Sequence, residues 1–525
     1  MIKNKQTADD LLKLSDAMYS QRGNVLSLWQ TLSDHFYPER ADFTITRTIG
    51  DEVCDRLMDS YPVIARRDLA NSYGSMLRDG KWFEMSTAQE INDGDAKGWR
   101  QWGTDRLYTL MQDRSSGFTR ATKEGDHDYA TFGQCALSVE ANRNLTGLLY
   151  RCWHLRDMAW FDDASGNVSG VSRKWNATYR DLDTYFGDKC HGKIREGNDK
   201  TPFSNTEVRH IVLPVDMYHD EGFAKYKFVS IFVDVVNRCI IEEKGMNHKY
   251  YVIPRFQTIA GSPYAISPAT MAALPNARLL QAMTFTLMEA SERVTRPPMI
   301  AKSNVISGGA IDLSANGITF VDAEYDERLG EGLRPLMTNV GGIPIGMEMR
   351  DRIVSILSSA FYLNKISLPE TTREMTAYEV QERMKQYRRE NLPLFAPMEA
   401  DYNGQLCETS FEIAMQAGLL GSPHDIPESL RGQEVVFKFK SPLTSAEEDK
   451  KLQTFRQAIQ TVGEVMPFDE QIVDNINFDT AFRDALGGIG VPEKWFYSVK
   501  QMTGMRQAES AMMAQQQAMQ QPVAE

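Results

Sequence analysis

The sequence predicts an α+β protein that is mainly helical, and three observations support this. Apolar residues recur every three or four positions through much of the chain, beginning with Leu11, Leu12 and Met18, and this is the spacing of one helix face. Between residues 136 and 267 the spacing shortens to two, which is typical of strands. With 525 residues, the chain is too long for one core, so we expect about three or four folded units.

Charge and composition narrow the classes of function. The chain carries 58 lysines and arginines against 71 aspartates and glutamates, a net charge of −13. This is the wrong sign for a protein that grips nucleic acid with its whole surface. No window approaches the roughly 20 apolar residues of a membrane span, and Met1–Lys5 lacks the apolar core of a signal peptide. We therefore expect a protein of the cytoplasm with no membrane partner.

The six cysteines predict neither disulfide bonds nor a metal site. They are scattered without a CxxC pair, which argues against a disulfide framework and a zinc ribbon. Cys152 with His154, and Cys190 with His191, each resemble half of a metal site, but neither has a second pair at ligand spacing. We expect small buried cysteines and no bound metal.

Residues 1–135 form the first predicted unit, and its pattern is mostly helical. One helix should end near Tyr37, because the residue before Pro38 is pushed out of the helical conformation. A second helical run extends from Val63 to Phe83, and a third from Trp99 to Leu110. The density of aromatic residues here indicates core packing.

Residues 136–267 form the second unit, a small β-rich domain. The predicted strands cover residues 137–141, 148–153, 168–175, 208–215, 227–236, 238–243 and 250–256. A helix is expected over 177–186. Segment 190–206, rich in Gly, Lys, Asp and Asn, is expected to be an exposed loop.

A long helix is predicted over residues 268–296. Ser267 should cap it, with Pro268 at the first helical position, and Pro275 should kink it. Beyond the kink, apolar side chains three and four apart predict a narrow, heptad-like seam. The seam residues are Leu280, Met283, Leu287, Ala290 and Val294. The run Arg296-Pro297-Pro298 then stops the helix.

A compact insert over residues 297–346 precedes a second helix over 347–363. The insert holds short strand candidates at 299–306 and 318–321. The second helix is predicted to present one apolar face to its neighbours. That face consists of Ile353, Leu357 and Phe361, and is broadened by Ile356 and Ala360.

A capping box marks the start of the next helix. Thr376 is followed three residues later by Glu379, so the hydroxyl accepts the N3 amide and the carboxylate accepts the N-cap amide. Met375 and Val380 stand where a hydrophobic staple needs them. We therefore expect a loop over 364–374 and a capped helix at the start of the unit 375–440.

The last predicted unit, residues 441–525, is helical and follows a strand at 434–439. Its final 25 residues hold seven glutamines and five methionines with almost no charge. Such a segment either packs in an oligomer or stays disordered.

The sequence contains none of the common catalytic motifs. It has no GxxxxGK[ST] phosphate loop, no GxSxG nucleophile turn and no HExxH metal motif. The glycine-rich stretches 341–346 and 487–490 lack the dinucleotide-binding context of strand, glycine turn and helix, and are expected to be turns. Asp162 and Asp163 lie in polar turn sequence. We predict no catalytic residues, no cofactor and no enzyme activity.

The order of helix, insert, helix, loop and capped helix resembles the portal proteins of short-tailed, podovirus-type bacteriophages, also called head-to-tail connectors. Its most specific part is Met375-Thr376-Ala377-Tyr378-Glu379-Val380 with Arg383, which is similar to the family's Thr-Ala-x-Glu-Val-x-x-Arg signature. Supporting stretches are Trp82-Phe83, Pro263-Tyr264, Ser267-Pro268-Ala269 and Ala273-Leu274-Pro275. Ala265-Ile266 departs from the pattern, where a Gly-Arg type pair is expected. The resemblance spans approximately residues 10–500.

The resemblance implies a phage portal fold and a dodecameric ring at one capsid vertex, through which DNA is packaged and later ejected. It assigns each predicted unit a part of that ring. The parts are an α-helical wing (1–135), a β-rich wing domain (136–267), two stem helices (268–296 and 347–363), an α/β clip (297–346), a tunnel loop (364–374), a crossing helix with further wing (375–440) and a helical crown (441–525).

Partners and contact residues also follow from the resemblance. The clip meets the terminase large subunit first and a tail adaptor afterwards, and scaffolding and major capsid proteins are further partners. Candidate docking residues are Arg296, Pro297, Lys302, Arg328 and Arg334. Candidates for the channel-facing loop are Asn364, Lys365, Ile366 and Ser367, with Lys365 favoured for a transient, non-specific contact with double-stranded DNA. The expected location is the virion, and the host cytoplasm during assembly.

The charge of the predicted clip fits a conduit, because tight gripping of phosphates by Lys and Arg would stall sliding DNA. Residues 297–348 hold three basic side chains and seven acidic ones, which gives a net charge of −4. The basic residues are Lys302, Arg328 and Arg334. The acidic residues are Asp312, Asp322, Glu324, Asp326, Glu327, Glu331 and Glu348.

Two other classes of function stay open. A metal-dependent DNA-processing enzyme could bring its carboxylates together only in the fold, and an adaptor or scaffold protein could bind partners without forming a channel. A closed ring distinguishes the portal from the adaptor. DNA turnover with Mg²⁺ or Mn²⁺ favours the enzyme.

Overall fold

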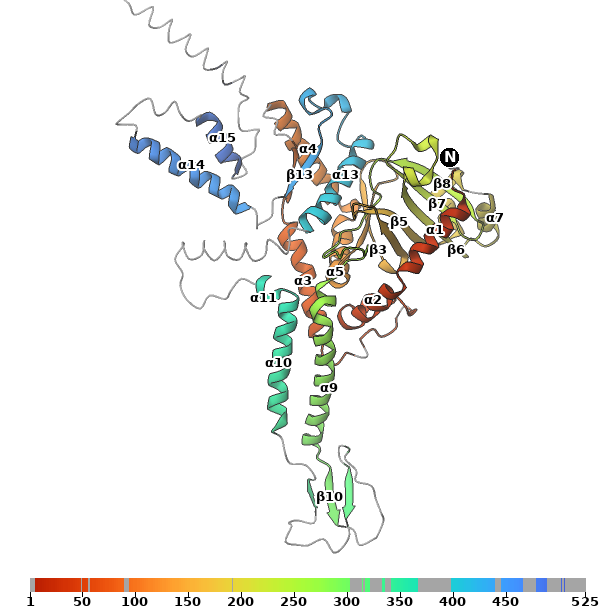
Figure 1. The fold of residues 1–525 in the computed structure, drawn as a ribbon, viewed down its shortest axis with the longest axis vertical. Helices are drawn as coiled ribbons and strands as arrows, with labels where there is room; N and C mark the ends of the chain where they lie inside the picture. Colours follow the sequence, from red (N-terminus) through yellow and green to blue (C-terminus); the bar gives the residue numbers. More distant parts are fainter. Residues whose placement is uncertain are drawn as a thin grey trace, which may run out of the picture.

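The fold is taken from a computed structural model of the chain (Figure 1). The structure describes residues 5–48, 50–54, 57–88, 94–190, 192–302, 314, 317–321, 333–335, 341–366, 398–439, 445–465, 478–488, 502 and 505. Mixed helices and sheets, with helices prevailing, confirm the predicted α+β class.

Helices dominate the N-terminal part, as predicted. They are α1 (Ala8–Gln21), α2 (Gly23–Phe36), α3 (Tyr61–Leu77), α4 (Gly94–Gln112) and α5 (Phe118–Phe132). A capping box between Thr7 and Asp10 starts α1. Helix α2 ends at Phe36, two residues before Pro38, which confirms the predicted boundary.

The expected helix from Val63 to Phe83 is too long by six residues. Helix α3 ends at Leu77, and Gly80 adopts a positive φ of 58° that turns the chain. Phe83 then begins strand β1 (Phe83–Thr87), which pairs antiparallel with β13 (Val435–Phe439). Since β13 lies near the other end of the chain, local periodicity could not reveal this pairing.

Two antiparallel sheets form the predicted β-rich region. The larger has strand order β4-β5-β6-β7-β8, with β4 (Met158–Asp162), β5 (Val168–Thr178), β6 (Asn205–Pro214), β7 (Phe228–Asp234) and β8 (Cys239–Met246). The smaller has the order β3-β2-β9, with β2 (Ala136–Ala141), β3 (Leu148–Trp153) and β9 (Tyr251–Val252).

Two features of this region differ from the prediction. Asp162 ends β4 and does not belong to a turn, because the preceding apolar residues pair with β5. The expected loop 190–206 contains a short helix, α7 (Gly192–Lys200), whose buried Ile194 anchors it.

Helices cover both faces of the five-stranded sheet. On one face, Leu11 and Met18 of α1 pack against Ile211, Val229 and Ile231 of the sheet. On the other face lie α7 and α6 (Tyr179–Phe186). The short helix α8 (Val215–Tyr218) follows β6. Single-turn 3₁₀ helices also occur at Pro38–Arg40, Arg114–Ser116, Leu155–Asp157, Gly187–Lys189, Glu221–Phe223, Pro423–Asp425 and Glu428–Leu430.

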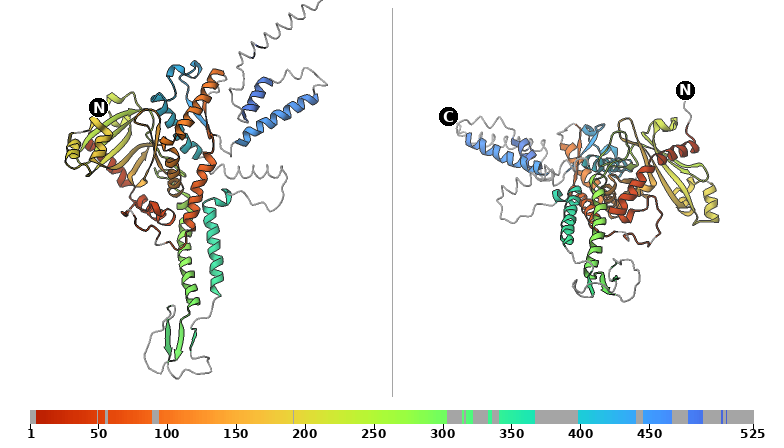
Figure 2. Two further views of the ribbon diagram at one scale, coloured as in Figure 1. Left: turned by 180° about the vertical axis from the view of Figure 1, so that it is seen from behind. Right: turned by 60° about the horizontal axis from the view of Figure 1, so that its bottom comes forward.

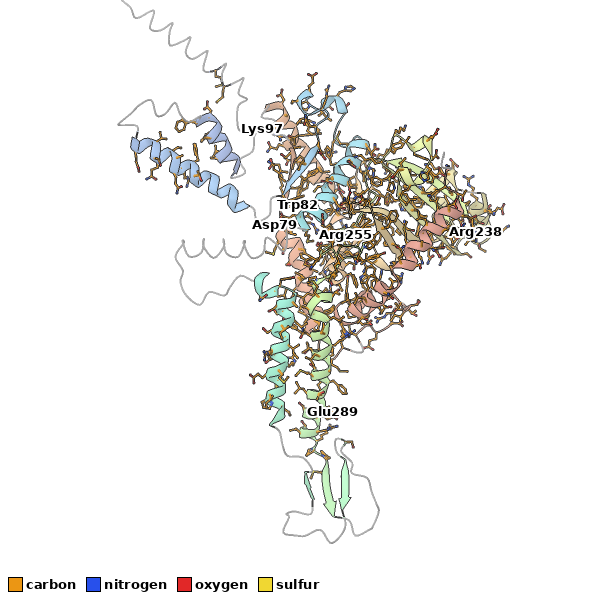
Figure 3. All side chains as sticks on the ribbon, viewed as in Figure 1. Asp79, Trp82, Lys97, Arg238, Arg255 and Glu289 are labelled. Carbon is orange, nitrogen blue, oxygen red and sulfur yellow. The ribbon has the colours of Figure 1, made fainter. Side chains whose placement is uncertain are left out.

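The main core joins the N-terminal helices, the three-stranded sheet and the segment after residue 398. Fully buried aromatic side chains fill it, and Figure 3 labels one of them, Trp82. Its largest members are Trp29, Trp82, Trp160, Tyr73, Tyr129, Tyr150 and Tyr402.

The long helix after the sheets begins differently from the prediction. A π-helical turn, η6 (Ala269–Ala273), precedes α9 (Leu274–Thr295). The chain is helical without a break from Ala269 to Thr295, since Ala273 and Leu274 both have helical φ and ψ. Pro275 follows directly on the π-helical turn, and the kink at Pro275 stays a prediction. The predicted cap is confirmed, since Ser267 Oγ accepts the Thr270 amide at 3.1 Å.

The second long helix, α10 (Gly342–Ala360), begins five residues before the predicted start. The stretch Gly342–Gly346 is helical and is not a turn. Tyr362, with a positive φ of 58°, separates α10 from the short helix α11 (Leu363–Ile366). Asn364, Lys365 and Ile366 are thus helical, and not loop residues as predicted.

Helices also make up most of the described C-terminal part. A π-helical segment, η8 (Met398–Gly404), leads into α13 (Gln405–Gln416), and Gly418 and Gly421 adopt positive φ beyond its end. Beyond β13, α14 (Ser445–Val465) contacts α15 (Phe478–Gly488). The glycines at 487 and 488 close α15, and the Gln- and Met-rich tail lies almost wholly outside the described residues.

Candidate assembly site: a two-helix stalk and the loop that clasps it

Helices α9 and α10 run side by side away from the body of the molecule, as two opposite views show (Figures 1 and 2). Helix α9 has 22 residues and α10 has 19, so they extend about 33 and 28 Å. At their far end lies a three-stranded sheet with order β11-β10-β12. We call these two helices and this sheet the stalk.

The stalk sheet is mixed. Strand β10 (Met299–Lys302) is parallel to β11 (Ile318–Val321) and antiparallel to β12 (Leu333–Pro335). The strands predicted at 299–306 and 318–321 are therefore found, the first of them described as far as Lys302.

The two helices pack closely at Gly346 of α10. A Cβ atom built on this glycine would lie 2.5 Å from Leu287 Cδ2 of α9, so only glycine permits this approach. The predicted seam is confirmed for Leu280, which is buried, and for Met283, Leu287 and Ala290, which are half-buried. Val294 is exposed and does not extend the seam.

The body end of α10 is anchored in the core. Ile353, Leu357 and Phe361 are buried, as predicted. The ring of Phe361 meets that of Phe36 edge-on, with 5.4 Å between centroids. Ile356, however, is exposed and does not broaden this face.

A loop that precedes α3 contacts both stalk helices. Gln281 of α9 accepts the backbone amides of Met58 at 2.7 Å and Asp59 at 2.9 Å, and donates to the Asp59 carbonyl at 2.7 Å. Arg350 of α10 donates to Asp59 Oδ2 from Nη2 at 2.7 Å and from Nε at 3.1 Å. Asp59 Oδ1 accepts the amide of Tyr61, the first residue of α3. One loop residue therefore links α3, α9 and α10.

Each stalk helix carries balanced charges and exposed apolar side chains. The charged residues are Arg278, Arg293, Glu289 and Glu292 in α9, and Arg350, Arg352, Glu348 and Asp351 in α10, so each helix has a net charge of zero. Figure 3 shows Glu289 on the outer half of α9; it pairs with Arg293 at 2.6 Å. The exposed large apolar residues are Leu279, Phe285, Met288 and Val294 in α9, and Ile345, Met347, Met349 and Ile356 in α10.

Charge also affects a histidine next to the stalk. Burial and the nearby Arg278 guanidinium lower the pKa of His35 below its usual range. His35 is therefore neutral near pH 7, and its burial places no unpaired charge between the body and the stalk.

The structure describes some of the predicted docking residues. Arg296 caps the C-terminus of α9 and is exposed, and Pro297 follows it half-buried. Lys302 ends β10 opposite Val321, and Arg334 lies in β12 opposite Ile300. Arg328 lies outside the described residues.

The structure likewise describes only some of the predicted channel residues. Asn364 is exposed in α11, and its amide donates to Ser359 Oγ at 3.4 Å. Lys365 and Ile366 belong to α11, while Ser367 lies outside the described residues. The signature residues Thr376, Ala377, Glu379, Val380 and Arg383 also lie outside them.

Asp59, Gln281 and Arg350 were not found by sequence reasoning. Gln281 stands between two seam residues, and Arg350 interrupts the apolar pattern of its helix. A polar residue at such a position is a sequence signal for a buried polar contact, but it does not identify the partner. Their common partner is 222 and 291 positions away along the chain, and a single sequence does not reveal such a contact.

The described residues offer no metal centre, since none of them form a group of three or more His, Cys, Asp or Glu side chains placed to hold a metal ion. All six cysteines are free, with Cys135, Cys190 and Cys407 buried and Cys54 exposed. None of the described helices is long and apolar enough to cross a bilayer.

Residues 8–497 match the family described as "Bacteriophage head to tail connecting protein". The chain belongs to this family. It is therefore a structural component of the phage particle, a portal that joins head to tail, which confirms the resemblance seen in the sequence.

Similar proteins include the portal protein of Salmonella phage epsilon15, which is 22% identical over 538 residues and is matched across 98% of this chain and 94% of that protein. Among solved structures, a chain in the neck of an empty gene transfer agent particle has 10% identity and a TM-score of 0.38, covering 76% of this chain and 86% of that chain. A chain of the native gene transfer agent virion also has 10% identity and a TM-score of 0.38, covering 81% and 95%.

Proposed function

We propose that this connector assembles into a closed ring, most simply a dodecamer, at one capsid vertex and serves as the conduit for genome packaging and ejection. The observation that carries the proposal is the pair of apolar surfaces that the stalk helices leave exposed. An isolated helix pair in water presents polar residues outward, whereas α9 and α10 each expose four large apolar side chains.

Three of the four exposed large apolar residues of α10 form a stripe on one face. Ile345, Met349 and Ile356 stand four and seven positions apart, which brings them to one side of a helix. Ile353 and Leu357, on a different side, already pack into the body. The stripe is thus free to meet the next subunit, where Phe285 and Met288 of α9 offer an apolar counterpart.

Within this ring we assign α9 and α10 to the stem, the β10–β12 sheet to the clip, the body to the wing, and α14 with α15 to the crown. The zero net charge of each stem helix and the acidic balance of the clip support a channel that does not grip DNA.

In this proposal, the clip docks the terminase large subunit during packaging and a tail adaptor afterwards, with Arg296, Lys302 and Arg334 as candidate contacts. Scaffolding and major capsid proteins surround the ring as it assembles in the host cytoplasm.

Electron microscopy and native mass spectrometry of the full-length protein test the ring. At micromolar concentration we expect closed rings with a central opening and a mass that is a whole multiple of 59.5 kDa. A stable monomer would contradict the ring, and specific binding of phage proteins without a ring would favour an adaptor. For the conduit, capsids assembled without the protein should fail to fill with DNA.

A further inference from the structure

The loop residues Met58 and Asp59 hold the two stalk helices by two different kinds of interaction. Toward α9, the contact is the amide of Gln281, whose oxygen and nitrogen both bond to backbone groups of the loop. All three hydrogen bonds are neutral and none of them involves the Asp59 carboxylate. They therefore persist whatever the charge of that side chain.

Toward α10, the contact depends on charge. The guanidinium of Arg350 approaches the Asp59 carboxylate through two hydrogen bonds, at 2.7 and 3.1 Å. The Asp59 side chain is only 7% exposed, whereas that of Arg350 is 38% exposed and also reaches Asp351 at 3.3 Å. Charge-assisted bonds are about twice as strong as neutral ones, but they disappear together when either charge is lost. The hydroxyl of Thr284 in α9 donates to the same carboxylate at 3.4 Å, so this one long contact toward α9 also depends on the charge.

Helix α10 is also attached to the body through its buried apolar face. Ile353, Leu357 and Phe361 are buried there, and Arg350 lies three positions before Ile353, about 4.5 Å along the axis. Between Arg350 and the stalk sheet, the close contact is with α9, where Gly346 meets Leu287. The Asp59–Arg350 pair is thus the attachment next to the buried Ile353, where α10 leaves the body and projects along α9.

We propose that Asp59 is a positioning residue that makes α9 the fixed helix of the stalk and α10 the releasable one. With the ion pair formed, α10 is held parallel to α9. With the pair broken, the stretch Gly342–Arg350 of α10 tilts about the buried Ile353 while Gln281 keeps α9 on the loop. The proposal rests on the proposed function for its meaning, because a releasable stem helix matters only if the stalk lines a conduit.

Hydrogen–deuterium exchange of the full-length protein, followed by mass spectrometry, tests the asymmetry. Asp59→Asn removes the charge and keeps an oxygen for the Tyr61 amide, and Arg350→Gln removes the partner. In either variant, amides of residues 342–352 should exchange about tenfold faster, as expected for the loss of charge-assisted bonds, while α9 keeps its wild-type rates. The double variant should exchange no faster than either single one, because both remove the same interaction.

Two controls separate this role from general loosening. Arg352→Gln changes an exposed arginine of the same helix and should leave exchange in α10 within twofold of the wild type. Gln281→Ala should accelerate exchange in α9 and in residues 57–60 more than in α10. If Asp59→Asn also accelerates exchange in the sheet strands β5 to β7, this variant has loosened the whole fold. In that case the exchange of α10 in Arg350→Gln alone tests the positioning role.

The proposal is wrong if both charge variants leave α10 within twofold of the wild type, or if they accelerate α9 and α10 equally. Native mass spectrometry of the same samples reports ring formation independently. Rings with an unchanged α10 would refute only the positioning role. Monomers with a selectively accelerated α10 would refute only the ring.

Discussion

At the scale of single residues, His127 predicts how stability responds to pH. It lies on α5, where its Nδ1 accepts a hydrogen bond from Arg66. Burial, together with Arg66, Lys123 and Arg67, lowers the pKa of His127 from 6.5 to about 4. Because the unfolded chain binds this proton more readily than the folded one, stability is lost as pH falls from about 6.5 through 4.

We expect His127→Gln to reduce this acid sensitivity. The shift corresponds to about 3 kcal/mol, and partial exposure of the ring reduces the expected effect to about 1–2 kcal/mol. The measurement is the drop in thermal midpoint between pH 7.5 and pH 4.5, which should be smaller for the variant. His424→Gln, at an exposed histidine, is the matched control and should follow the wild type. An equal drop in all three proteins would show that His127 is not responsible.

Single residues also show where sequence reasoning ends. The cap at Ser267 and the helix stop before Pro38 were predictable, because each depends on neighbours within a few positions. The Asp59 contacts with Gln281 and Arg350 depend on the fold. The central feature of the candidate site was therefore not predictable from the sequence. The signature around Thr376 led to the family, and its structural role remains a prediction.

At the scale of elements, Gly346 predicts how the stalk responds to a larger side chain. Gly346→Val would place a branched side chain where even a Cβ lies 2.5 Å from Leu287, so the two helices must separate. We expect a loss of about 1–3 kcal/mol, as for other overpacked contacts, measured as a lower thermal midpoint. The matched control is Gly342→Val on the same helix, where a Cβ meets nothing within 4 Å. Equal effects of the two changes would contradict the close packing.

The elements themselves were predicted unevenly, for a physical reason. Strands such as β6 and β7 have sequence neighbours as partners and alternate clearly, so their period of two was visible. Strand β1 pairs with β13 from the other end of the chain and was taken for the end of a helix. The glycines of 342–346 indicated a turn, but the close contact with Leu287 explains why a helix contains glycine there.

At the scale of the whole molecule, the two stalk helices project from a body whose largest core is rich in aromatic side chains. That core draws on the N-terminal helices, the small sheet, the segment after residue 398 and the body ends of α9 and α10. The stalk helices leave eight large apolar side chains exposed. These side chains support the proposal that neighbouring copies complete the described fold.

Ile356 offers the most direct test of that completion. Ile356 is 42% exposed, and burial of this remaining surface against a neighbour would contribute about 1 kcal/mol, a fraction of the value for a fully exposed side chain. Ile356→Glu removes this contribution and places a charge in the interface, so we expect at least a tenfold higher concentration for ring assembly, measured by native mass spectrometry. The thermal midpoint of the dissociated subunit should stay near the wild type, because Ile356 does not pack into the body.

Ser355→Glu introduces the same charge at the adjacent exposed position, on a different side of α10, and should assemble as the wild type does. If Ile356→Glu forms rings at wild-type concentrations, the stripe of Ile345, Met349 and Ile356 is not the surface through which the subunits meet.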